Sequence, residues 1–313
     1  MAESFNTLAG LVQINDQNLA DIMVSDLLQG APTVAAINAV TASNGTQHKY
    51  LKETTASSAA FREPLAGLTK TASADTLVTD TLKVLDATFA TDVALARGHS
   101  GGVDAYLQRE LMRSLKQAFF VTETQIFDGV NGDSGGFVGL RDDTQLDALA
   151  DEMVISAGTA GTTADVQSSV YLIRSSDNDV SLVAGNDGQI VADEDPVIIE
   201  KVVNPGTDNK TYPAYYVPVL GYIGFQIGGA RSAARICNVE TALDDDDIYA
   251  ALALFPAGLG PTHICMNRAS AALLRKSRTA VNATGAPAPV PTNVDGIPII
   301  ITDGISQTEA ILS

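Results

Sequence analysis

The chain is predicted to fold as an α+β protein, because its helical and strand-like patterns occur in separate stretches. Apolar residues recur at helical spacing over residues 103–128, whereas runs rich in Thr and β-branched residues occur within 50–85 and 170–227. The last part, residues 245–303, has the order helix, strand, helix, strand. At 313 residues the chain can bury a large core, as one elaborate unit or two lobes.

The N-terminal part is predicted to be extended. Residues 1–45 form an arm with one short helix, which Asn15 can cap and which ends before Pro32. Residues 46–85 hold two strand-forming runs on either side of Pro64 and Gly67, which predicts a long two-stranded ribbon with a bent tip. An isolated hairpin has no second layer to bury its face. We therefore expect this ribbon to lie on a neighbouring subunit.

A single long helix is predicted over residues 103–128, within a region that spans 86–140. Its apolar stripe comprises Val103, Leu107, Leu111, Leu115, Phe119, Thr122 and Ile126. Asp104 near its start and Gly129 after its end fit the two termini, and the helix would be roughly 37 Å long. Arg109, Arg113 and Lys116 form a basic stripe on the opposite side, which is either a solvated face or a charged contact with another subunit.

The second half of the chain is predicted to be rich in strands. Residues 129–170 are loop-rich, and strand-like runs follow at 170–174, 197–199, 215–220 and 222–227. The final region begins with four aspartates, residues 244–247, directly before an apolar helix. Clustered carboxylates suit Ca²⁺, but the spacing is not that of an EF-hand loop, so a helix cap is the preferred interpretation.

Composition limits the functions that the chain can have. It carries 37 acidic and 19 basic residues, a net charge of −18, which disfavours binding to phosphate backbones by the surface as a whole. Two cysteines, Cys237 and Cys265, are too few for a disulfide framework and are expected to be buried free thiols. Prolines and glycines interrupt the apolar stretch 248–266, so it is not expected to span a membrane.

No catalytic, cofactor-binding or metal-binding constellation is predicted. The sequence Gly-Asp-Ser-Gly-Gly at 132–136 reproduces the nucleophile motif of chymotrypsin-like serine proteases, and His48 and Asp92 precede Ser134 in the order of that family. Those proteases are pairs of β-barrels, whereas here a long helix ends directly before the motif. A Gly-rich turn is therefore preferred to a serine hydrolase. The three histidines have no spacing that would converge on a metal.

The order of these elements resembles tailed-phage major capsid proteins with the HK97-like fold. The matching features are the arm, a ribbon carrying Phe61-Arg62-Glu63-Pro64, the long helix, and the terminal Met266-Asn267-Arg268 and Gly296-Ile297-Pro298. The resemblance implies an N-terminal arm at 1–45, an extended loop at 46–85 and a peripheral domain with its spine helix at 86–140. It also implies a loop and sheet segment shared between domains at 141–238 and an axial domain of mixed sheet and helices at 239–313.

The position of one segment along the chain differs from that in many members of this family and indicates a particular subgroup. Their peripheral-domain sheet follows the Gly-Ile-Pro strand, whereas here its equivalent is expected at 169–238, before the last axial-domain helices, as in a subgroup of these proteins. The arm starts almost at Met1, so a separate scaffolding protein, or none, is expected.

The resemblance implies a structural protein, not an enzyme, that assembles in the bacterial host cytoplasm into an icosahedral shell of pentamers and hexamers around double-stranded DNA. Its partners would be copies of itself and the scaffolding, portal and decoration proteins of the virion, with no cofactor and no membrane. An encapsulin nanocompartment, which keeps the fold and changes the cargo, is the alternative. The residues predicted to make contacts between subunits are Lys52, Arg62, Lys70, Arg109, Arg113 and Lys116.

Overall fold

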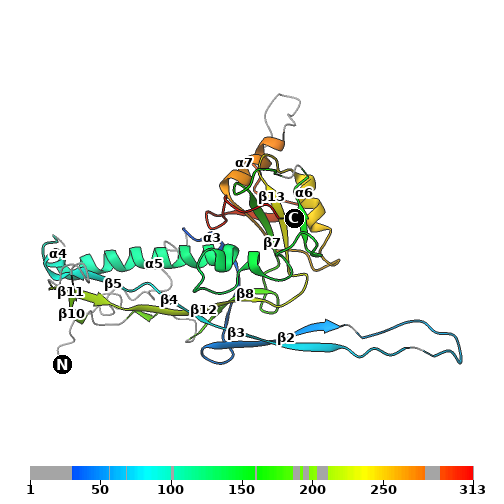
Figure 1. Cartoon of the computed structure of the whole chain (residues 1–313), viewed down its shortest axis with the longest axis horizontal. Coiled ribbons are helices and arrows are strands. Elements are labelled where there is room, and N and C mark those ends of the chain that lie inside the picture. Colours follow the sequence, from blue (N-terminus) through cyan, green and yellow to red (C-terminus); the bar gives the residue numbers. More distant parts are fainter. Residues whose placement is uncertain are drawn as a thin grey trace.

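The computed structural model describes residues 30–55, 57–67, 69–99, 102–158, 161–185, 191–192, 197–202, 211–278 and 290–312. Figure 1 shows three parts: a long helix lying along a layer of strands, a lobe above one end of that helix, and a two-stranded ribbon that projects from the body. The predicted α+β class is confirmed. The helix predicted after Asn15 lies outside the described residues.

The long helix is α5 (Gly102–Asp128), as predicted. Its apolar stripe packs Leu107, Leu111 and Leu115 against Val217 and Val219 of the strand layer. The helix gives way at Gly129 to a short 3-10 turn, η1 (Gly129–Asn131). Gly129 has a φ of +54°, and a Cβ there would lie 2.6 Å from the Gly139 nitrogen, so only glycine fits this turn.

Two sheets lie beside α5. The three-stranded sheet has the order β10 (Val197–Val202), β11 (Thr211–Val217), β5 (Phe89–Asp92). The five-stranded sheet has the order β1 (Ala39–Thr41), β8 (Val180–Ala184), β12 (Val219–Ile227), β4 (Lys83–Asp86), and β9 (Val191–Ala192) also pairs with β12. The runs predicted at 215–220 and 222–227 therefore have other bounds in the structure. The chain passes from one sheet to the other at Pro218, which has no N–H to donate to a ladder.

The lobe is built on a six-stranded sheet and contains most of the hydrophobic core. The strand order is β15 (Asn293–Val294), β16 (Ile297–Ile301), β14 (His263–Met266), β7 (Ser168–Ile173), β13 (Ala233–Val239), β6 (Val154–Ser156). Helices α6 (Asp245–Leu252) and α7 (Arg268–Ser277) complete the predicted order of the terminal region. Asp244 and Asp247 form a capping box at the start of α6, which confirms the interpretation as a helix cap.

The strands of segment 169–238 are divided between two parts of the molecule. Its two ends, β7 and β13, pair with each other inside the sheet of the lobe, and only the strands between them lie along α5. Every residue of β7 and β13 is buried, so both strands need cover on both faces. The lobe supplies that cover, because residues of α6 and α7 such as Ile248 and Leu274 belong to the same hydrophobic core as β7 and β13.

The ribbon consists of β2 (Gln47–Thr55) and β3 (Ala74–Thr81), paired with each other in antiparallel fashion, as predicted. At its root, His48 Nε2 and Gln226 Oε1 lie 2.7 Å apart, and the Tyr50 hydroxyl donates to the Ile227 carbonyl oxygen at 3.5 Å. These contacts hold the ribbon against the end of β12. The remaining elements are α3 (Pro32–Ala36), α4 (Val93–Arg97) and η2 (Leu140–Asp142). Within the described ranges, no helix has the length and apolar character that a bilayer crossing requires.

Candidate assembly surfaces

The ribbon exposes large apolar side chains to solvent. Phe61 and Leu65 at the tip have relative accessibilities of 108% and 104%, and Leu51 and Leu77 on the stem have 68% and 59%. The two stem residues face each other across the ladder. Apolar side chains grouped on one projecting element are typical of a surface that another protein covers.

The ribbon tip is ordered by its own hydrogen bonds. The Arg62 guanidinium donates to the Ala66 carbonyl oxygen at 3.0 Å, and the Ala66 N–H donates to the Glu63 carbonyl oxygen at 3.1 Å. The Ser58 N–H donates to the Thr71 carbonyl oxygen at 3.0 Å, closing the loop below the tip. Leu65 has a φ of +66°, a conformation that is costly for a branched side chain. The tip therefore presents its apolar side chains in a defined turn.

The predicted ribbon cations have different surroundings. Arg62 and Lys70 are exposed near the tip, whereas Lys52 is half-buried near the root. Burial raises the pKa of Asp80 and of Asp143, and the Lys52 charge acts in the opposite direction on both. Lys52 therefore interacts with carboxylates of its own chain.

The predicted basic stripe on α5 is partly paired within the helix. Glu110 Oε1 lies 2.8 Å from Arg113 Nη1 and 3.4 Å from Arg109 Nη2, and the Arg109 guanidinium also lies 4.9 Å from the ring centre of Tyr106. Lys116 is exposed and makes no ion pair with any residue that the structure describes. Exposed pairs of this kind contribute little to stability, so these side chains are available for other contacts.

A buried carboxylate joins three elements at the base of the lobe. Glu123 of α5 accepts hydrogen bonds from the Thr33 N–H at 3.1 Å and the Thr33 hydroxyl at 3.0 Å, and it also accepts one from the Thr302 hydroxyl. Burial raises the pKa of Glu123, and these hydrogen bonds oppose the rise. Sequence reasoning missed this residue. The available signal was a charged residue on the apolar stripe, between Phe119 and Ile126.

A second buried network fixes the C-terminal residues to the lobe. Arg235 Nη2 lies 2.7 Å from Glu309 Oε2, with the two side chains only 3% and 2% exposed. Arg235 also donates to the Ser169 hydroxyl and to the Leu146 carbonyl oxygen, each at 2.9 Å. Asp128 lies at the end of α5. Burial and the nearby Glu309 carboxylate together raise the pKa of Asp128 to about 6.

The residues of the serine protease motif are not brought together. His48 bonds Gln226 at the ribbon root, Asp92 caps α4 by accepting from the Ala94 N–H at 2.7 Å, and Ser134 is exposed in the turn after η1. No hydrogen bond between the three occurs in the described part of the chain. The glycines of the motif have a structural role instead. A Cβ on Gly136 would overlap the Gln125 amide, which donates to the Phe137 carbonyl oxygen at 2.6 Å.

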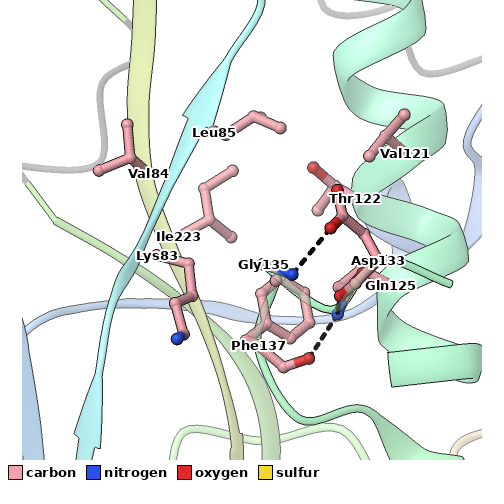
Figure 2. Close-up of a pocket in the computed structure, with 11 residues that line it drawn as sticks. Lys83, Val84, Leu85, Val121, Thr122, Gln125, Asp133, Gly135, Phe137 and Ile223 are labelled. Carbon is pink, nitrogen blue, oxygen red and sulfur yellow. Dashed lines mark hydrogen bonds between the residues drawn. The ribbon is translucent and has the colours of Figure 1, made fainter. Parts of the chain in front are cut away.

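A cavity of about 150 Å³ lies between this turn, the strands and α5. Figure 2 shows Leu85 and Ile223 pointing from β4 and β12 toward Val121 on the helix, with Phe137 between them. Lys83 and Asp133, both exposed, lie at its edge. The cavity is thus lined by apolar side chains together with the polar Thr122 and Gln125, and it carries one charge of each sign at its edge.

Both cysteines are buried free thiols, as expected, and burial raises the pKa of Cys237 to about 11. Such thiols are unreactive at neutral pH. Within the described residues there is no group of three His, Cys, Asp or Glu side chains that could hold a metal ion.

Solved structures with similar folds include phage capsid chains. A chain in the structure of bacteriophage Epsilon15 matches with a TM-score of 0.61 at 19% identity, covering 88% of each chain. A chain of the bacteriophage JBD30 capsid matches with a TM-score of 0.51 at 9% identity, covering 94% of this chain and 97% of that one. The JBD30 capsid decorated with minor capsid protein trimers matches with a TM-score of 0.50 at 10% identity, over 95% and 99%. At these identities the likeness establishes the fold, and the HK97-like prediction is confirmed.

No curated protein sequence matches the chain significantly. The family model described as "Major capsid protein GP7" matches residues 15–313, which is nearly the whole chain. That match includes the ribbon, α5, both sheets beside it and the lobe. The chain therefore belongs to the major capsid protein GP7 family.

Proposed function

We propose that this capsid protein assembles as pentamers and hexamers into the icosahedral shell that encloses the double-stranded DNA of a tailed phage. The observation that carries the proposal is the ribbon, a two-stranded ladder whose large apolar side chains are exposed on both stem and tip. Such an element needs a second layer, and a neighbouring copy in a closed shell provides one. Each contact is small, but a closed shell uses many simultaneously.

The charge of the chain supports enclosure of DNA without sequence-specific binding. With a net charge of −18, the surface as a whole repels a phosphate backbone. A lining of this kind would leave the genome free to move as it is packed. Assembly would take place in the cytoplasm of the bacterial host, and the shell would belong to the virion.

We propose the following division of the chain. Residues 1–45 form the arm, 46–85 the extended loop and 86–140 the peripheral domain with its spine helix. Residues 141–238 are shared between the peripheral and axial domains, and 239–313 form the axial domain. The pairing of β7 and β13 inside the lobe supports a shared middle segment, because the chain leaves the lobe after β7 and returns at β13.

We propose further partners for this protein by analogy with a similar capsid. The JBD30 capsid to which the fold is similar carries minor capsid protein trimers, which supports a decoration protein on this shell as well. A portal and a scaffolding protein would serve the same assembly. Co-purification of a scaffolding or decoration protein with particles from the natural source would test these partners.

We propose that exposed basic side chains make contacts between subunits: Lys52, Arg62, Lys70, Arg109, Arg113 and Lys116. The strongest support is for Arg62 and Lys70, which are exposed on the ribbon, and for Lys116, which has no ion pair among the described residues. Lys52 has the weakest support, because it already faces Asp80 and Asp143. Arg62→Glu is expected to abolish shells while the monomer keeps its circular dichroism spectrum. Normal particles from Arg62→Glu would exclude this role for Arg62.

Electron microscopy of the purified protein tests the proposed function. Uniform hollow shells are expected, and a persistent monomer at high protein concentration would contradict the proposal. An encapsulin is the alternative with the same fold. Particles from the natural source that contain an enzyme and no nucleic acid would favour it. The remote alternative, a hydrolase that uses Ser134, predicts labelling of this residue by a fluorophosphonate probe, which we do not expect.

A further inference from the structure

Three buried polar atoms where α5 meets the lobe have no hydrogen-bond partner among the described residues. They are the Tyr171 hydroxyl oxygen, Asp128 Oδ1 and Glu309 Oε1. The three residues have relative accessibilities of only 0%, 8% and 2%, so bulk solvent does not satisfy these atoms. A buried polar atom without a partner is costly, and three of them in one region require an explanation.

The three side chains lie close together, although they come from distant parts of the sequence. The Tyr171 ring centre is 5.4 Å from that of Phe127, the residue before Asp128, and 5.9 Å from Cζ of Arg235. Arg235 in turn binds Glu309, with Nη2 2.7 Å from Oε2. Burial raises the pKa of the Tyr171 hydroxyl, the Arg235 charge opposes the rise, and the charges of Glu309 and Asp128 add to it. The carboxylates therefore act on this hydroxyl at short range.

These groups cannot satisfy one another directly. An ionised carboxylate only accepts hydrogen bonds, and the Tyr171 hydroxyl has a single proton to donate. If it donated to Asp128, the free oxygen of Glu309 would still lack a donor, and the reverse choice would leave Asp128 without one. One water molecule provides what is missing, because it donates two hydrogen bonds and accepts from the hydroxyl. Buried waters in proteins typically make about three hydrogen bonds to groups of this kind.

The charges around the three atoms favour a neutral ligand over a metal ion. Arg141 Nη1 lies 3.9 Å from Asp128 Oδ1, and Arg235 pairs with Glu309, so two cations already balance the two carboxylates. Asp142 is a further nearby anion, but both of its oxygens accept hydrogen bonds from η1. An added cation would be repelled by the two guanidinium groups, whereas a water molecule would not.

We propose that this junction binds one internal water molecule, which accepts from the Tyr171 hydroxyl and donates to Asp128 Oδ1 and Glu309 Oε1. The three groups belong to β7, to the end of α5 and to the C-terminal segment, so the water joins the middle of the lobe to the helix and to the last residues. The C-terminal segment pairs with β7 only beside its start, at the single bridge between Gln167 and Glu309. The water gives Glu309 a second point of attachment, and its binding does not depend on assembly into a shell.

A high-resolution density map of the wild-type protein, from crystals or from assembled particles, tests the site directly. We expect a peak about 2.7–3.0 Å from each of the three oxygens, the distance of a hydrogen bond. A map with ordered side chains and no peak would overturn the inference. So would a peak with oxygen contacts of about 2.0–2.6 Å, which would identify a metal ion.

Tyr171→Phe tests the hydrogen bonding of the hydroxyl while keeping the ring. If the hydroxyl had no partner, its removal would leave stability unchanged or raise it, because an unpaired buried donor would be lost. We expect the opposite: an unfolding equilibrium constant about tenfold higher in urea denaturation at neutral pH, since a hydrogen bond to the water is lost. Tyr249→Phe is the matched control, because the same change on this half-exposed residue of α6 should have no effect.

A Tyr171→Phe variant at least as stable as the wild type would overturn the inference. If this variant does not fold, the wild-type map still decides whether the water is present. Neither result bears on shell formation, so the inference and the proposed function can fail independently.

Discussion

The lobe and the ribbon use the same backbone pairing with opposite side-chain environments. In the lobe, every residue of β7 and β13 is buried. In the ribbon, β3 has only Val78 and Asp80 partly buried, although it pairs with β2 from end to end apart from a register shift between Glu53 and Thr55. Hydrogen bonds between strands satisfy the backbone in both places, but burial of apolar side chains stabilises only the lobe. The lobe is thus a folded unit by itself, and the ribbon is a folded element that lacks a second layer.

The two regions also differ in how they are attached to the rest of the molecule. The lobe is joined to α5 through the buried Glu123, which accepts hydrogen bonds from Thr33 and Thr302. The ribbon is joined through its root, where His48 meets Gln226 and Lys52 is near Asp143. The first attachment excludes water and is expected to be rigid. The second is half-buried, so the angle of the ribbon can adapt to its neighbour.

The largest expected loss of stability comes from breaking the buried ion pair of the lobe. Arg235→Ala leaves the Glu309 carboxylate uncompensated at 2% exposure, and breaking such a pair typically costs about 3–5 kcal/mol. Urea denaturation of the unassembled chain measures this loss. The double variant Arg235→Met with Glu309→Leu should recover most of it, because no unpaired charge remains. A single variant as stable as the wild type would show that the pair contributes nothing.

The next effect is expected at the attachment of the lobe to α5. Glu123→Ala leaves the buried donors of Thr33 and Thr302 without their acceptor, at an expected cost of about 2–4 kcal/mol. Glu123→Gln, which keeps one acceptor oxygen, should lose less. Denaturation midpoints of the two variants test this order. Equal midpoints for Ala and Gln would indicate that the hydrogen bonds are not what stabilises the junction.

A smaller effect that depends on pH is expected at the end of α5. Asp128 has its pKa raised from the ordinary value of 3.8 to about 6, so the folded state binds this proton more tightly than the unfolded state. Its contribution to stability is present below pH about 4 and is lost as the pH rises through 6. Asp128→Asn removes that loss and should be more stable than the wild type above pH 7, by about 1–3 kcal/mol.

Denaturation midpoints from pH 4 to pH 8 test this prediction. The two proteins should have similar stability near pH 4 and diverge as the pH rises. Parallel curves over the whole range would contradict the assignment to Asp128. A substitution on the ribbon provides the comparison. Asp75→Asn lies on the exposed ribbon, so its denaturation midpoints should follow those of the wild type from pH 4 to pH 8.

The smallest effect on the isolated chain is expected in the ribbon. Leu77→Ala removes a side chain that is 59% exposed and should change the free energy of unfolding by less than about 0.5 kcal/mol. Leu172→Ala is the matched substitution in the lobe, where the side chain is fully buried, and should cost about 2–5 kcal/mol. Similar losses at the two positions would mean that the ribbon already has a second layer in the monomer.

Sequence patterns predicted the elements well where the signal is local. The period of α5, the two runs of the ribbon and the cap at Asp244 were each readable from adjacent residues, and the order of strands and helices after residue 245 followed from turn residues. The patterns did not predict which sheet each strand joins. For β7 and β13, a strand that is buried along its whole length looks the same in sequence whether it lies beside α5 or inside the lobe.

The candidate assembly surfaces also combine features that local sequence predicts with features that only the structure shows. The basic residues of the ribbon and of α5 were identified from the sequence, and their role in contacts between subunits stays a prediction. The cavity beside α5 could not be predicted, because β4, β12, α5 and the turn at 133–137 each supply part of its wall. Glu123 was visible as a charge on an apolar stripe, but its partners lie 90 and 179 residues away.

By itself, the sequence determined the class of the fold, the long helix, the ribbon and the resemblance to phage capsid proteins, because helix period, strand alternation and turn chemistry are properties of neighbouring residues. The tertiary structure alone decided the pairing of β7 with β13, the burial of Glu123 and Arg235, and the cavity that faces solvent beside α5. These depend on contacts such as Ser169 with Glu309, 140 residues apart, and closing so long a loop has no signature in local sequence.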